Sequence, residues 1–218
     1  MKRIYANGYF VPAALLLFGA LPISVAVLRL FQIPMGTLPP DSIKMVVVPV
    51  AHFSHVLAGA TFGLLGPLQL TARLRSARPH LHRILGRIHV LAGLFLALSG
   101  LRLVTTFPDS ATMVLDAARI LGSVALLCTL WLAISAIRRR DINRHRAWMI
   151  RGYAIGMGGN AVVLGMILYL ILIGSEPVGL TGDIVFVVSW AISILVAEWL
   201  VRRNPRRHVA AHTAVAAR

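Results

Sequence analysis

The sequence predicts an all-α membrane protein whose helices cross the bilayer several times. Of its 218 residues, 58% are apolar and only 13% are charged, and the mean hydropathy is +0.80. A water-soluble domain of this size could not bury so much apolar surface, so the composition places the chain in lipid. No polar stretch is long enough to fold separately, and we therefore expect residues 1–203 to form a single transmembrane domain.

Six apolar runs have the length that a membrane-spanning helix requires. Each contains about 20 residues or more, enough to cross a hydrocarbon core of about 30 Å. The runs cover residues 8–32, 45–71, 86–105, 112–137, 148–173 and 181–201. Proline and acidic residues interrupt the chain near Pro40, Pro108 and Pro177, as expected at the turns of helical hairpins. The first run is longer than the apolar part of a typical signal peptide, so we expect it to be a retained anchor.

The basic residues gather on one side of this predicted bundle. Of the 22 Lys and Arg residues, 18 lie on one side: before the first run, after the last run, or in and just after the two connections rich in Arg and His. By the positive-inside rule this side is cytoplasmic, and six spans place both termini there. The net charge of +15 is thereby explained by topology and by anionic lipids at the cytoplasmic face, and nucleic acid is excluded as a partner. We expect residues 204–218 to form a flexible basic tail.

Two histidines lie inside the second run, where an ionisable residue is by default a functional candidate. At 100° per residue, one helix face carries His52, His55, Gly59, Gly63 and Gly66. Glycines at this spacing either let another helix pack closely, which is the commoner case, or leave a flat slot for a porphyrin or quinone ring. For the two imidazoles, contact with a ligand and plain hydrogen bonding between helices explain the pattern equally well.

A second group of histidines lies at the predicted cytoplasmic edge. His82 and His89 share a helix face at i and i+7, and His145 precedes the fifth run. Imidazoles from facing helices are typical axial ligands of haem, and His and Arg beside Gly also suit a quinone head group, a phosphate or an anionic lipid. The alternative is that each arginine only anchors the membrane edge.

The two His-Arg pairs of this edge occupy similar positions in the chain. His82-Arg83 and His145-Arg146 are 63 residues apart, and each pair lies just before an apolar run. Parallel repeats formed by spans two and three and by spans four and five would produce this spacing, and the alternative is coincidence.

Acidic residues are scarce inside the runs. No Asp or Glu lies in the middle of any run, and Glu198, near the end of the last, can pair with Arg202 at i+4. Coupled transporters often relay protons through buried carboxylates, so a small-solute transporter ranks third among our hypotheses. We interpret Arg29, Arg102 and Arg119 as charges at the outer membrane edge that Asp109 and Asp116 can neutralise, and the alternative is an anion-binding vestibule.

Four stretches of the sequence resemble a known family. They are HVLAGATFGLLGPLQ from His55, HRILGR from His82, HRAWMIRGY from His145 and AEWL from Ala197. Together they resemble the bacterial family of predicted membrane proteins catalogued as domain of unknown function 2306, over roughly residues 50–203. The resemblance implies a six- or seven-helix membrane fold in the bacterial inner membrane, and it implies no assigned reaction.

The resemblance also bears on the choice of ligands. The recurring positions of the family match His55, Gln69, His82, Arg83, Gly86, Arg87, His145, Arg146, Trp148 and Arg151 of this chain. His52 and His89 depart from the family pattern, His89 standing where an aromatic residue is common. This shifts the expected iron ligands to His55, His82 and His145.

Our leading hypothesis from the sequence is an electron-transfer protein that binds b-type haem or quinone near the cytoplasmic half. The expected cofactor-binding residues are His55, His82, His89, His145, Arg83, Arg87, Arg146, Arg151 and Gln69. A hypothesis from a different class is a non-enzymatic accessory or assembly subunit, with a larger membrane complex or a second copy of the chain as partner.

Overall fold

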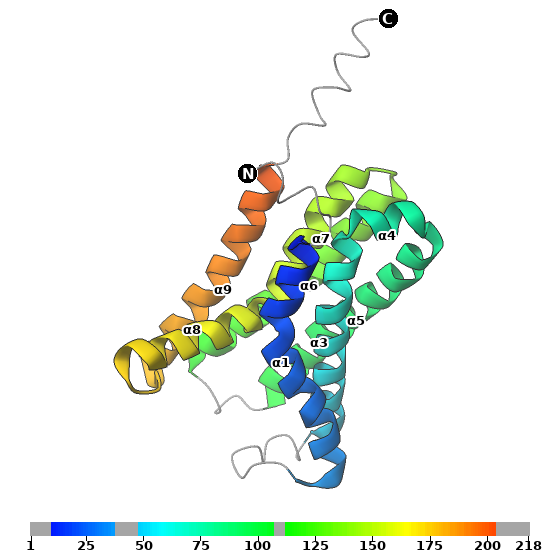
Figure 1. The fold of residues 1–218 in the computed structure, drawn as a ribbon. Coiled ribbons are helices and arrows are strands. Elements are labelled where there is room, and N and C mark those ends of the chain that lie inside the picture. The colour runs from blue at the N-terminus through cyan, green and yellow to red at the C-terminus, as the bar shows by residue number, and fades with distance from the viewer. Residues whose placement is uncertain (1–9, 38–47, 107–111, 204–218) are drawn as a thin grey trace, which may run out of the picture.

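The computed structural model describes residues 10–37, 48–106 and 112–203, and no strand occurs in these ranges (Figure 1). The helices are α1 (Phe10–Met35), α3 (Pro49–Leu70), α4 (Ala72–Ala77), α5 (Pro79–Thr106), α6 (Met113–Arg138), α7 (Ile142–Gly156), α8 (Gly158–Ile173) and α9 (Gly179–Arg202). The predicted all-α class is confirmed. The predicted basic tail, residues 204–218, lies outside the described residues.

The described ranges contain the helices of a multi-pass membrane protein. Four of them are long and apolar enough to cross a bilayer, namely Ala13–Gln32 within α1, and α5, α6 and α9. The pair α7 and α8 makes a fifth if its bend of 43° lies within one span. The predicted second span also forms a helix, the 22-residue α3, whose two histidines and Gln69 lower its hydropathy.

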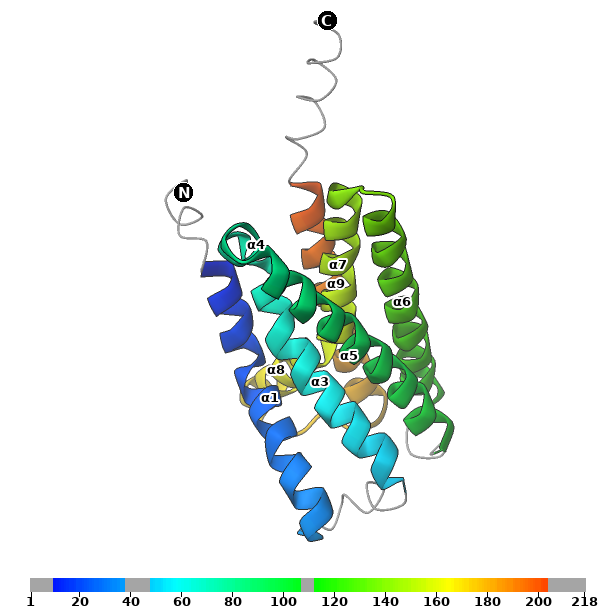
Figure 2. The same cartoon turned by 90° about the vertical axis from the view of Figure 1, so that its right-hand side faces the viewer.

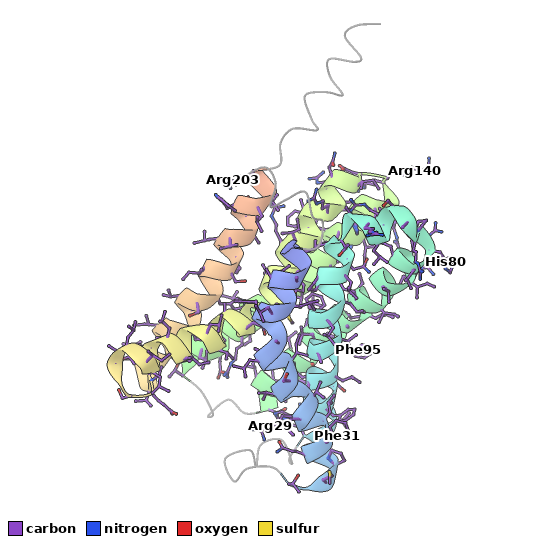
Figure 3. All side chains as sticks on the ribbon, viewed as in Figure 1. Arg29, Phe31, His80, Phe95, Arg140 and Arg203 are labelled. Atoms are coloured by element: carbon purple, nitrogen blue, oxygen red, sulfur yellow. The ribbon has the colours of Figure 1, made fainter. Side chains whose placement is uncertain are left out.

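Neighbouring helices in the chain pack as antiparallel hairpins. Helix α3 packs against α1 and α5, α5 packs against α6, and α6 packs against α7, while α9 contacts both α7 and α8. Figure 2 shows that α1, α5 and α7 begin at the same end of the bundle at which α6 and α9 finish. This end carries the basic residues of 73–87, 138–151 and 202–203, and we name it the arginine end. Figure 3 shows Arg140 and Arg203 here and Arg29 at the opposite end.

The centre of the bundle combines one large ring with small residues. Phe62 of α3 is fully buried, with 0% of its surface exposed. A Cβ on Gly93 of α5 would lie 2.8 Å from this ring, and a Cβ on Gly156 of α7 would lie 2.7 Å from it. Both helices therefore approach α3 closely because they lack a side chain there. The two glycines are 63 residues apart, like the two His-Arg pairs, which favours the repeat interpretation over coincidence.

The fifth apolar run is broken, although the sequence predicts one uninterrupted span. Helix α7 ends at Gly156 and α8 begins at Gly158, after which α8 runs to one side of the bundle (Figure 1). The indole of Trp190 from α9 fills the break, because a Cβ on Gly158 would lie only 1.8 Å from its Cδ1 atom. Trp190 Nε1 donates a hydrogen bond of 2.9 Å to the carbonyl of Ile155, in the last turn of α7. A carbonyl at the helix end thereby gains a side-chain donor.

Candidate functional site

A partly open cavity of about 490 Å³ lies between the helices, in the half of the bundle away from the arginine end. Its walls come from α3, α5, α6 and α9 and from the break between α7 and α8. Most of the lining is apolar or glycine, and the polar and aromatic groups belong to His52, His55, Arg119, Ser123, Phe186 and Trp190. Sites for small organic ligands typically have this size and this mixture of apolar walls with a few polar groups.

The two histidines of α3 form one wall of the cavity. His52 and His55 lie one turn apart near the start of the helix, on the face turned toward α5 and α6. The Nδ1 atom of His55 lies 3.0 Å from the hydroxyl oxygen of Ser99 on α5. The Ser99 hydroxyl in turn donates to the carbonyl of Phe95 at 2.6 Å, a common arrangement for serine inside a helix. This chain of hydrogen bonds fixes the His55 ring against α5.

Arg119 brings a positive charge to the cavity. Among the described residues that line it, Arg119 is the one with a permanent charge. Its Nη1 atom lies 3.6 Å from an oxygen of Asp116, and its guanidinium lies 5.7 Å from the centre of the Phe186 ring. The predicted ion pair with Asp116 is thus present. Since 3.6 Å is longer than a hydrogen bond, this contact leaves guanidinium N–H groups for a ligand.

Trp190 forms a rigid wall opposite the histidines. Its ring lies between two glycines, because a Cβ on Gly122 would be 2.1 Å from Cη2 and a Cβ on Gly158 would be 1.8 Å from Cδ1. Phe186 packs edge-on against it, with ring centres 5.4 Å apart. Together with the hydrogen bond to Ile155, these contacts leave the indole little freedom to move.

At the arginine end, Gln69 and His82 close the hairpin between α3 and α5. The side-chain amide of Gln69 is oriented so that its nitrogen and its oxygen both have partners. The nitrogen donates to the His82 carbonyl at 3.2 Å, and the oxygen accepts from the Gly86 backbone N–H at 3.3 Å. The Nε2 atom of His82 lies 3.3 Å from the carbonyl of Gln69. Three of the residues that resemble the family pattern therefore hold two helix ends together.

His145 closes the hairpin between α6 and α7 in a similar way. Its Nδ1 atom donates to the carbonyl of Ala133 at 2.9 Å. Both histidines lie at the arginine end, and the proximity of the two His-Arg pairs stays a prediction. His55 does not join them, because it lies near the start of α3 whereas His82 follows its end. Within the described ranges, no group of three or more His, Cys, Asp or Glu side chains is arranged to hold a metal ion.

The arginines of the predicted site have different surroundings. Arg151 donates to Glu198 at 2.8 Å and lies 4.8 Å above the Trp148 ring. Arg202 donates to the other oxygen of Glu198 at 2.7 Å, which confirms the predicted i, i+4 pair. The remaining arginines of the predicted set have exposed side chains, and they are Arg83, Arg87 and Arg146.

His89 belongs to the aromatic centre of the bundle. Only 1% of it is exposed, and its ring stacks on Phe62 at 4.1 Å, with Tyr153 at 6.3 Å. Tyr153 donates to the carbonyl of Gly63 at 3.2 Å, and a Cβ on Gly66 would lie 2.1 Å from the Tyr153 ring. Close helix packing, the commoner explanation for the glycine face of α3, is therefore confirmed for Gly63 and Gly66, toward the arginine end.

A comparison with protein families matches residues 52–201 to the model described as predicted membrane protein (DUF2306). The chain belongs to this family. The matched range runs from α3 to α9 and contains every residue that lines the cavity, and the resemblance drawn from the motifs is confirmed. No curated protein and no solved structure matches the chain. Membership in DUF2306 shows an integral membrane protein and assigns no reaction.

Reasoning from the sequence identified His55 but missed most of the cavity. His52 was set aside because it departs from the family pattern, yet it lines the cavity beside His55. Arg119 was assigned to the membrane edge. A signal was available on α6, where Arg119, Gly122 and Ser123 at i, i+3 and i+4 form a stripe of polar and small residues that faces the cavity. Phe186 and Trp190 carry no comparable signal.

Proposed function

We propose that this DUF2306 protein crosses the bacterial inner membrane six times, with the arginine end in the cytoplasm. Helix α3 would be the second span. It packs between α1 and α5 and alternates in direction with them, as a span between two others would. The basic residues at the arginine end support this orientation, because cytoplasmic loops are enriched in Lys and Arg.

We further propose that the cavity binds a lipid-soluble quinone. The observation that carries this proposal is a cavity of about 490 Å³ in which polar groups face aromatic and apolar walls. The two carbonyl oxygens of a quinone accept hydrogen bonds, and Arg119 and Ser123 supply donors. The flat head group would lie against the rings of Phe186 and Trp190. Bilayer lipid surrounds such a bundle, so an isoprenoid tail would find an apolar environment.

A haem with two axial histidines fits this cavity less well. His52 and His55 come from the same helix and are one turn apart, so they cannot ligate iron from opposite faces of a porphyrin. The other described residues lining the cavity include no His, Met or Cys. The haem hypothesis at the arginine end would use His82 and His145. It predicts a Soret band, and sharp α and β bands on reduction, that disappear in His145→Ala; a colourless protein after expression with ample haem would contradict it.

The experiment that tests quinone binding uses Trp190 as the reporter. In a variant with Trp131, Trp148 and Trp199 replaced by Phe, a short-chain quinone or its reduced quinol should quench the emission of Trp190 with a saturating curve. Solvent extraction of the purified wild-type protein should release about one quinone per chain. Absence of both saturable quenching and an extracted quinone would refute the proposal.

A matched pair of arginine variants adds specificity to the titration. Arg119→Gln should weaken binding by about tenfold, since a hydrogen bond from a charged donor is worth roughly 1.5 kcal/mol or more. Arg102→Gln is the control, because Arg102 is exposed on α5 and does not line the cavity. Equal affinities in the two variants would place the ligand away from Arg119.

A second candidate function is transport of a small solute. The break between α7 and α8 lines the cavity at Ile155, Gly156 and Gly159. Interrupted helices frame the substrate site in many transporters. Proteoliposomes should then accumulate the compound that binds, and binding without flux would contradict transport. The accessory-subunit hypothesis instead predicts a protein without a ligand that travels with a larger complex in mild detergent.

A further inference from the structure

The hydrogen bonds around Ser99 determine which nitrogen of His55 carries a proton. A serine hydroxyl has one hydrogen, and two backbone carbonyls of the preceding turn compete for that of Ser99, the carbonyl of Phe95 at 2.6 Å and that of Leu96 at 3.2 Å. The Ser99 oxygen must therefore act as the acceptor in its 3.0 Å contact with Nδ1 of His55. It follows that Nδ1 is the nitrogen that bears hydrogen.

A second acceptor lies on the same side of the His55 ring. The backbone of Leu96 also forms a hydrogen-bonding interaction with His55. Its carbonyl lies 3.2 Å from the Ser99 hydroxyl oxygen, so the two acceptors are neighbours on α5. The other nitrogen, Nε2, is left for a ligand.

Nε2 of His55 is a hydrogen-bond acceptor as long as the ring is neutral. A neutral imidazole has one N–H, and here it is on Nδ1. A second proton would create a cation inside the bundle, in a cavity that already contains Arg119 and that no described carboxylate lines. Unpaired charge in such a place is costly, so the ring stays neutral. The cavity thus offers donors from Arg119 and Ser123 and an acceptor from His55.

One of the donors lies on the same side of the cavity as the His55 ring. A Cβ on Gly100 would lie 3.5 Å from Cε1 of His55 and 3.1 Å from the hydroxyl oxygen of Ser123. The imidazole and the Ser123 hydroxyl therefore line the same part of the cavity. A head group that only accepts hydrogen bonds would satisfy Ser123 and leave the lone pair of His55 without a donor.

We infer that the cavity selects the reduced, hydroxyl-bearing form of its ligand, a quinol or related phenol, whose hydroxyl donates to Nε2 of His55. This inference rests on the proposed quinone function and names the form that binds. Ser99 is a positioning residue, because it touches no ligand and acts by holding the hydrogen on Nδ1. The same acceptor would discriminate against the oxidised quinone, which has no hydrogen to donate.

The test compares three probes on the full-length protein in nanodiscs. They are a short-chain quinol kept reduced without oxygen, the corresponding quinone, and the quinol dimethyl ether, which keeps the ring but has no donor. We expect the quinol to bind about tenfold more tightly than the ether, the difference made by one hydrogen bond to a buried acceptor. Equal affinity of all three probes would overturn the inference and leave the proposed function intact. Failure of all three to bind would refute the proposed function itself.

Two variants and one control assign the preference to His55. His55→Leu should bind quinol and ether equally. Ser99→Ala should reduce the preference at least threefold, because the imidazole can then move its hydrogen to Nε2. Ser193→Ala is the matched control, since Ser193 also donates to a backbone carbonyl, that of Ala154 at 3.1 Å, but does not line the cavity. A preference for the quinol over the ether that survives in both His55→Leu and Ser99→Ala would overturn the inference. A haem spectrum that His55→Leu abolishes would also overturn it.

Discussion

Replacing Gly122 by Ala should destabilise the bundle by displacing Trp190. The new Cβ would lie 2.1 Å from Cη2 and 2.5 Å from Cζ2 of the indole. Carbon atoms in contact prefer about 3.5–4.0 Å, so the ring would have to move by more than about 1 Å. The indole cannot move away in the opposite direction, because Gly158 lies against its other side. A shift of this size would also stretch the 2.9 Å hydrogen bond to Ile155 beyond its useful range.

The expected magnitude follows from three contributions. Overpacking costs about 1–3 kcal/mol, and loss of the indole hydrogen bond costs about 1 kcal/mol. Alanine in place of glycine favours the helix by about 1 kcal/mol. The net loss in the free energy of unfolding is therefore about 1–3 kcal/mol, which lowers the melting temperature by several degrees in a chain of this length.

The assay is thermal unfolding in detergent, followed by Trp190 emission in the variant that lacks the other tryptophans. Gly159→Ala is the control, because a Cβ on Gly159 would meet no atom within 4 Å. The Gly122→Ala protein should melt below this control and show a shifted Trp190 emission. If the two alanine variants melt together and the emission is unchanged, the Trp190 wall is not packed as described.

Three further predictions concern topology, the arginine end and its ion pairs. Reporter fusions should signal cytoplasm after Arg75, Arg140 and Arg203 and the outside at Pro40, Ser110 and Gly179, and one clear reversal would contradict six spans. In a Cys128→Ser chain, His82→Cys and His145→Cys should crosslink through a short spacer, because the two His-Arg pairs occupy equivalent positions at the arginine end; a folded protein that fails to crosslink would make them independent anchors. Arg151→Gln should lower the melting temperature more than Arg202→Gln, since Arg151 joins two helices and its side chain is 26% exposed, against 78% for Arg202; equal shifts would count against this.

The sequence predicts a helix well where the run is long, apolar and bounded by charged residues, and less well at the arginine end, where α5 and α7 begin before the predicted runs. The run at 112–137 matches α6 (Met113–Arg138), for example, almost residue for residue. The break between α7 and α8 could not be predicted in the same way. Glycines at 156, 158 and 159 are equally compatible with close packing in a straight helix. What decides the geometry is Trp190, a residue of another helix that fills the break.

The candidate site was predictable only where one residue carries an unusual chemical group. His55 stands out because imidazole is rare inside a membrane span. The cavity itself depends on how α3, α5, α6 and α9 are arranged around the break between α7 and α8. This arrangement cannot be predicted from the sequence of any single apolar run. The same limit applies at the arginine end. The acceptors of His82 and His145 are backbone carbonyls, and every residue has one.

His82 and His145 differ in role from His55, and their hydrogen-bond partners explain the difference. His82 binds a carbonyl near the end of α3 and His145 binds one near the end of α6, so their imidazoles hold hairpins together. His55 instead binds a hydroxyl whose own hydrogen is already committed to Phe95, which leaves Nε2 as an acceptor on a cavity wall. Structural roles at the arginine end therefore give no reason to assign a structural role to His55. Its chemistry has to be judged from the cavity, and there the available donors and acceptor favour a ligand that carries both oxygen acceptors and a hydroxyl hydrogen.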